Sequence, residues 1–188
     1  MTMTTGRKLT FYPAPEPNGT GVLVLPGGGY GNISWDNEGP PPASWLNERG
    51  FDAWILRYTV DSHHGATAPV YPAPIDEAVE AVGQIRASGR ETPSSIVDFA
   101  ILTYPVITMH PEAMHEGSLR NLLGYDAAEE VRLGMCAETR VGAHTPARLP
   151  VPHGQRPHRA RGEYTADEQR SWTGELERWI VGFVDVKA

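Results

Sequence analysis

A short apolar run that ends in glycines constrains the fold of this chain most strongly. Residues 22–25 read Val-Leu-Val-Leu, and Pro26 with three glycines follows directly. A continuous apolar run of this length, closed by chain breakers, is typical of a strand buried on both faces of a parallel sheet. The glycines let the backbone turn sharply and point its N–H groups at a ligand oxygen. We therefore expect a buried strand that leads into a ligand-binding turn.

Strands and helices alternate along the rest of the chain. The pattern predicts strands over 22–25, 51–58 and 97–106, and helices over 41–49, 75–88, within 118–135 and from Thr165 onward. Such alternation indicates an α/β fold, a parallel sheet with helices on both faces in a three-layer sandwich. In the helix over 75–88, an apolar stripe is expected to face the core, formed by Ile75, Val79, Val82 and Ile85.

Composition limits the class of protein. A length of 188 residues suits a single domain over 1–188. The formal net charge of −7 argues against nucleic acid as a partner, and the absence of about 18 consecutive apolar residues argues against a membrane span. Cys136 stands alone, which excludes a disulfide framework. The first ten residues hold no apolar segment of a signal peptide, so a cytoplasmic protein is expected.

The glycine turn admits several interpretations. A dinucleotide fingerprint would need a glycine where Asn32 stands, and a phosphate-binding Walker loop would need a following Gly-Lys-Ser/Thr. Two interpretations stay open, a plain structural turn and the oxyanion loop that follows a strand in esterases and lipases.

Several segments, in a common order, carry a family resemblance. They are Val22–Tyr30 with Ser34, Phe51–Tyr58, Tyr71–Asp76, Phe99–Thr108, Gly117–Gly124 and Glu138–Pro146. Together they resemble bacterial α/β-hydrolases related to acetyl xylan esterases and feruloyl esterases. The resemblance implies carboxylic-ester hydrolysis of a small-molecule ester or an acetylated carbohydrate. It also implies that the amides of Gly28 and Gly29 stabilise an oxyanion.

The nucleophile that this family requires is missing. No serine of the chain has glycine at both −2 and +2, so there is no G-x-S-x-G elbow. The family places the elbow between the segments matching 75–88 and 99–104. Residues 89–98 connect them here, too few for a βα unit of roughly 30 residues. We therefore expect a truncated α/β-hydrolase fold without the central elbow strand, in which the strand over 22–25 pairs directly with the strand over 97–106.

The other members of a catalytic triad are also in question. Residues 147–162 contain four Arg and two His but no carboxylate, and we expect an atypical basic loop there without the triad acid. His153, followed by Gly154, resembles the family's late His-Gly pair; the alternatives are His158 or an ordinary exposed loop histidine. Because the remaining histidines show no ligand spacing, no metal or other cofactor is expected.

These observations leave different functions open. The first is a carboxylic-ester hydrolase that is impaired or inactive. The second is a non-catalytic remnant or binding module that keeps the oxyanion loop. A third is a partner subunit that takes up a strand at an exposed sheet edge, and the oligomeric state is not determined.

Overall fold

The computed structural model describes residues 3–5, 8–62, 69–88, 99–103, 105–143 and 145–151. Contacts divide the chain into two units, the first comprising Met1–Pro93 and Ile107–Glu138, the second Ser94–Val106 and Thr139–Ala188. The helix expected from Thr165 lies outside the described residues. That all 188 residues form a single domain stays a prediction.

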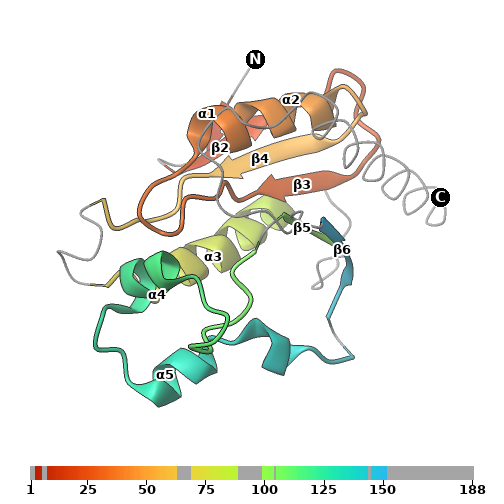
Figure 1. The fold of residues 1–188 in the computed structure, drawn as a ribbon. Helices are drawn as coiled ribbons and strands as arrows, with labels where there is room; N and C mark the ends of the chain where they lie inside the picture. The colour runs from red at the N-terminus through yellow and green to blue at the C-terminus, as the bar shows by residue number, and fades with distance from the viewer. Residues whose placement is uncertain are drawn as a thin grey trace, which may run out of the picture. The chain divides into compact units, whose positions relative to one another are not determined.

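A four-stranded sheet forms the centre of the first unit (Figure 1). Its strands, in spatial order, are β1 (Met3–Thr5), β2 (Leu9–Tyr12), β4 (Asp52–Leu56) and β3 (Gly21–Val24). β3 and β4 are parallel, whereas β1 with β2 and β2 with β4 are antiparallel. The sheet is therefore mixed. β3, the strand expected before the glycine turn, does pair in parallel, but all of its residues are half-buried, so the expected burial on both faces is wrong. β3 is the last strand in the order of this sheet, and among the described residues it has one neighbouring strand, β4.

Helices cover both faces of this sheet. Figure 1 shows α1 (Trp35–Glu38) and α2 (Pro40–Asn47) on one side and α3 (Ala73–Ala87) on the other. Successive side chains of a strand point to opposite faces of the sheet. Trp54 and Leu56 of β4 join a buried cluster with Ile85 of α3. Ala53 and Ile55, both fully buried, point to the opposite face, where α2 lies.

The buried side of α3 differs from the expected stripe. Its buried residues are Pro74, Ala81 and Ile85, whereas Val79 is 69% exposed. The sheet presents two stacked aromatic rings to this helix, Phe11 and Trp54, with centroids 4.7 Å apart. Ala81 and Ile85 of α3 join these rings in one buried cluster, so the helix faces the sheet with these two residues and not with Val79.

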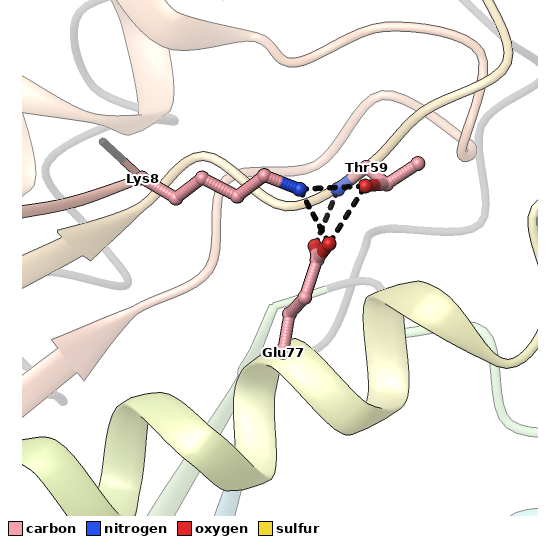
Figure 2. A network of polar contacts seen from close by, with 3 residues as sticks. All are labelled: Lys8, Thr59 and Glu77. Carbon is pink, nitrogen blue, oxygen red and sulfur yellow. Dashed lines mark hydrogen bonds and ion pairs between the residues drawn. The ribbon is translucent and has the colours of Figure 1, made fainter. Parts of the chain in front are cut away.

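A polar network joins α3 to the sheet (Figure 2). The Lys8 ammonium forms an ion pair with the Glu77 carboxylate and donates to Thr59 Oγ1 at 2.8 Å. Thr59 in turn donates to Glu77 from its amide and from its hydroxyl, each at 2.7 Å. Desolvation raises the pKa of Glu77, but the hydrogen bonds from Lys8 and Thr59 outweigh it, so the pKa lies below its ordinary value.

The first unit also contains α4 (Glu116–Leu123) and α5 (Glu129–Gly134). The expectation of short helices within 118–135 is confirmed, although α4 begins two residues earlier. α4 buries Ser118, Leu119, Asn121, Leu122 and Leu123. The 3₁₀ helix η1 (Ala137–Arg140) follows α5. Within the part of the chain that the structure describes, none of the helices has the length and apolar character needed to cross a membrane.

The described strands of the second unit are β5 (Phe99–Thr103) and β6 (Ala147–Val151), which pair in parallel along their whole length. One expectation is therefore wrong. Residues 147–151 form a strand instead of the beginning of a basic loop, because the ladder of β5 satisfies their backbone. The expected pairing of the strand over 22–25 with the strand over 97–106 stays a prediction: β3 pairs with β4 in the first unit, and β5 pairs with β6 in the second.

Candidate functional site

The backbone carbonyls of the glycine loop, residues 26–30, are all occupied. Tyr58 Oη donates to the Pro26 carbonyl at 2.5 Å, and the Ser34 amide donates to that of Gly27 at 2.9 Å. The Gly28 carbonyl accepts from the amides of residues 31 and 32, at 3.1 and 3.2 Å. The Gly29 carbonyl accepts from Asn121 Nδ2 at 2.9 Å and the Tyr30 carbonyl from the Asp61 amide at 2.7 Å. The carbonyl side of the loop is thus held by the protein.

The amides of the same loop are only partly bonded within the described protein. The Gly27 amide donates to Glu38 Oε2 at 2.7 Å. Among the described residues, no group accepts a hydrogen bond from the next amides, those of Gly28, Gly29 and Tyr30. Successive N–H groups in a turn form a concave site for an anion or a polarised oxygen. The loop therefore presents three neighbouring donors whose acceptor is not part of the described protein.

The conformation of the loop requires its glycines. Gly28 has a φ of +135°, which an L side chain rarely adopts, and a Cβ there would lie 2.1 Å from the Asn32 carbonyl oxygen. Gly29 has a φ of +60°, and Tyr30 follows with a φ of 59° although it is not a glycine. Three successive residues with positive φ make a tight turn, and successive N–H groups in a turn can form a concave site for an anion.

Residues at the beginning of helix α4 contact the glycine loop at Gly29. Its N-cap residue His115 accepts from the Ser118 amide through Nδ1 at 3.2 Å, and the same nitrogen lies 2.8 Å from Ser118 Oγ. Ser118 Oγ lies 3.3 Å from the position that a Cβ of Gly29 would take. One turn along the helix, Asn121 holds the Gly29 carbonyl. One face of α4 thus fixes the orientation of the Gly29 peptide.

Two tyrosines stabilise the other side of the loop. The rings of Tyr30 and Tyr58 pack edge to face with centroids 6.3 Å apart. Burial raises the pKa of Tyr58 to about 12, with the nearby charges of Tyr30 and Glu38 adding to the effect. Burial also raises the pKa of Tyr30. Tyr58 therefore remains protonated at neutral pH and keeps donating to the Pro26 carbonyl.

The structure brings together only some of the residues singled out from the sequence. Gly28 and Gly29 lie side by side, and their amides have no acceptor among the residues that the structure describes. His153 and the alternative His158 lie outside the described residues. The contact of His115 and Ser118 with the loop was missed. Its only signal was the segment Gly117–Gly124, which resembles the family without any indication of what it touches.

The amides of residues 28–30 are suited to bind an oxygen atom that carries negative charge. Three amides can stabilise a carboxylate or a polarised carbonyl oxygen. Ser118 and His115 have the contact of a nucleophile and its base. However, the Ser118 side chain is only 1% exposed, which leaves no path for an acyl group to its hydroxyl.

No family model matches the chain. Among curated proteins it is similar to an acetylxylan esterase of Xylanibacter ruminicola, with 30% identity over 142 residues, covering 63% of this chain and 29% of the relative. It is also similar to endo-1,4-beta-xylanase B of Butyrivibrio fibrisolvens, with 27% identity over 163 residues, covering 66% of this chain and 25% of the relative. The chain thus spans less than a third of either relative.

Solved structures show the same fold. An acetyl ester-xyloside bifunctional hydrolase of Caldicellulosiruptor lactoaceticus matches with a TM-score of 0.64 and 23% identity, covering 76% of this chain and 64% of that one. A lipase/esterase of Lactobacillus plantarum matches with a TM-score of 0.57 and 16% identity, covering 80% and 74%. These matches confirm a truncated α/β-hydrolase fold. Together with the curated acetylxylan esterase, they confirm the resemblance to esterase-like α/β-hydrolases.

Proposed function

We propose that this chain, an esterase-like α/β-hydrolase by resemblance, binds the carbonyl or carboxylate oxygen of a small acyl compound at the Gly28–Tyr30 amides and forms no acyl-enzyme. The observation that carries the proposal is the asymmetry of the loop. Its carbonyls are held by protein donors, while the amides of Gly28, Gly29 and Tyr30 have no acceptor among the described residues. Buried or partly buried amides are nearly always satisfied, so an oxygen from outside is the expected partner.

The ligand class follows from the donors and from the relatives. Three neutral amides favour a single oxygen atom that carries full or partial negative charge. The relatives are named for acetylxylan and acetyl ester-xyloside chemistry, which supports an acetyl group on a carbohydrate as the ligand. The missing elbow serine supports binding without turnover, since oxyanion donors alone form only part of a hydrolytic site.

Amide chemical shifts test the binding directly. In ¹⁵N-labelled protein, acetate should shift the amide resonances of residues 28–30, and an equal concentration of chloride should not. Gly83→Ala, a change in α3 where a methyl group meets nothing within 4 Å, is the matched control and should behave as wild type. Asn121→Ala releases the Gly29 carbonyl and should reduce the shifts. Shifts spread evenly over the protein, or none at residues 28–30, would contradict the proposal.

A second candidate is ester hydrolysis by Ser118, favoured by its 2.8 Å contact with His115 Nδ1. A fluorophosphonate probe separates the two functions, because it reacts only with an activated and accessible serine. Labelling of Ser118 that Ser118→Ala removes would establish the second candidate. Absence of labelling, together with acetate shifts in the loop, would support binding without turnover.

A further inference from the structure

Three different ligand groups come together in the first unit, formed by residues other than those that hold the glycine loop. They are the imidazole of His110, the thiol of Cys136 and the carboxylate of Glu138. A ring nitrogen, the sulfur and a carboxylate oxygen of these residues all lie within 4.8 Å of one another. Cys136 follows α5 and Glu138 belongs to η1, whereas His110 comes from the segment that precedes α4. Sequence spacing gives no sign of the cluster, because its members come from two separate segments.

The backbone holds the two segments together. The Ala137 amide donates to the Ile107 carbonyl at 2.8 Å and so joins the two segments. Within the second segment, the Cys136 amide donates to the Leu133 carbonyl at 3.1 Å. Cys136 is fully buried, and its sulfur accepts from the Met109 amide at 3.4 Å. An N–H that donates to the sulfur orients the side chain that would bind a metal ion.

The hydroxyl of Thr108 also takes part in the cluster. Thr108 Oγ1 lies 3.8 Å from Cys136 Sγ and accepts from the His110 amide at 3.2 Å. Ligand residues in metal sites are oriented in this way by groups that do not touch the metal. The side chains of His110 and Glu138 are exposed, so an ion can reach them from solvent.

The donor set selects a class of metal ion. Mg²⁺ and Ca²⁺ prefer oxygen ligands alone, so a set with sulfur and imidazole disfavours them. Imidazole, thiolate and carboxylate are all ligands of Zn²⁺, and three protein ligands leave a fourth tetrahedral position open to water. We propose that His110, Cys136 and Glu138 bind one divalent transition-metal ion of the zinc class. On binding, the Cys136 thiol loses its proton to solvent, and sulfur, nitrogen and oxygen each donate an electron pair to the ion.

Cobalt(II) gives a direct test, because thiolate coordination adds a charge-transfer band in the near ultraviolet. Cys136 is the only cysteine of the chain, so a band that appears at one cobalt per chain identifies its sulfur as a ligand. We expect that band in the wild type, its loss in Cys136→Ser, and displacement of cobalt by ZnCl₂. Cobalt binding without the band would overturn the proposal, since histidines elsewhere in the chain could bind the ion.

Variants of the two exposed ligands keep the test valid if Cys136→Ser fails to fold. His110→Ala and Glu138→Gln should each weaken cobalt binding by at least about tenfold, the smallest loss typical of disturbed metal sites. Glu130→Gln, an exposed carboxylate of α5, is the matched control and should leave affinity unchanged. A band that neither His110→Ala nor Glu138→Gln weakens would overturn the site as assigned.

Discussion

Replacement of Gly28 by alanine tests the geometry of the glycine loop most sharply. The added Cβ would stand 2.1 Å from the Asn32 carbonyl oxygen and 2.7 Å from its carbon. These are backbone atoms, so the clash is relieved only if the turn itself moves. The φ of +135° at this position adds strain, because L residues rarely adopt it.

The expected loss of stability follows from these contacts. Strain at a disfavoured φ costs about 1–3 kcal/mol. Moving Asn32 also breaks the two hydrogen bonds that the Gly28 carbonyl accepts from the amides of residues 31 and 32, each worth about 0.5–1.5 kcal/mol. The sum is about 2–6 kcal/mol, a large part of the roughly 5–15 kcal/mol by which domains are stable.

Urea unfolding followed by circular dichroism measures the change. Gly83→Ala is the matched control, because Gly83 lies inside α3 and a methyl group added there meets nothing within 4 Å. It should gain about 0.5–1 kcal/mol, since glycine is a poor helix former. If Gly28→Ala lost less than about 0.5 kcal/mol, the size of an ordinary surface change, the geometric reasoning would be wrong.

Further predictions concern the polar contacts of the first unit. Glu77→Gln should cost about 1 kcal/mol at neutral pH. Because the folded pKa of Glu77 is lowered, its contribution is present above the ordinary value of 4.5 and is lost as pH falls through the folded pKa; acid titration of stability should therefore be steeper in the wild type than in Glu77→Gln. Asn121→Ala should cost roughly 1–3 kcal/mol in chemical unfolding because the Gly29 carbonyl loses its donor; a loss at the low end is expected, since Asn121 Oδ1 is itself buried without a partner among the described residues. Purified wild-type protein should show no burst with an activated acetate ester, and a stoichiometric burst would establish a working nucleophile.

Much of the local structure was predictable from the sequence. The apolar run before Pro26 predicted β3, observed over Gly21–Val24, and the periodic segment over 75–88 predicted α3, observed over Ala73–Ala87. The strand and the helix could each be predicted from residues close together in the sequence, because chain breakers and apolar periodicity are signals that extend over only a few positions. The face of α3 was not predictable, since Phe11 and Trp54 on distant strands decide which side of the helix is buried.

The sequence alone determined that a glycine turn follows an apolar strand and that no elbow serine is present, because both are properties of consecutive residues. The tertiary structure alone decided what surrounds that turn. α4 carries Ser118 and Asn121 to Gly29, a residue far away in the chain, and the strand over 147–151 exists through its ladder with β5. Long-range contacts of this kind leave no periodic pattern in the sequence, because the hydrogen-bond donor and its acceptor lie in segments that are far apart along the chain.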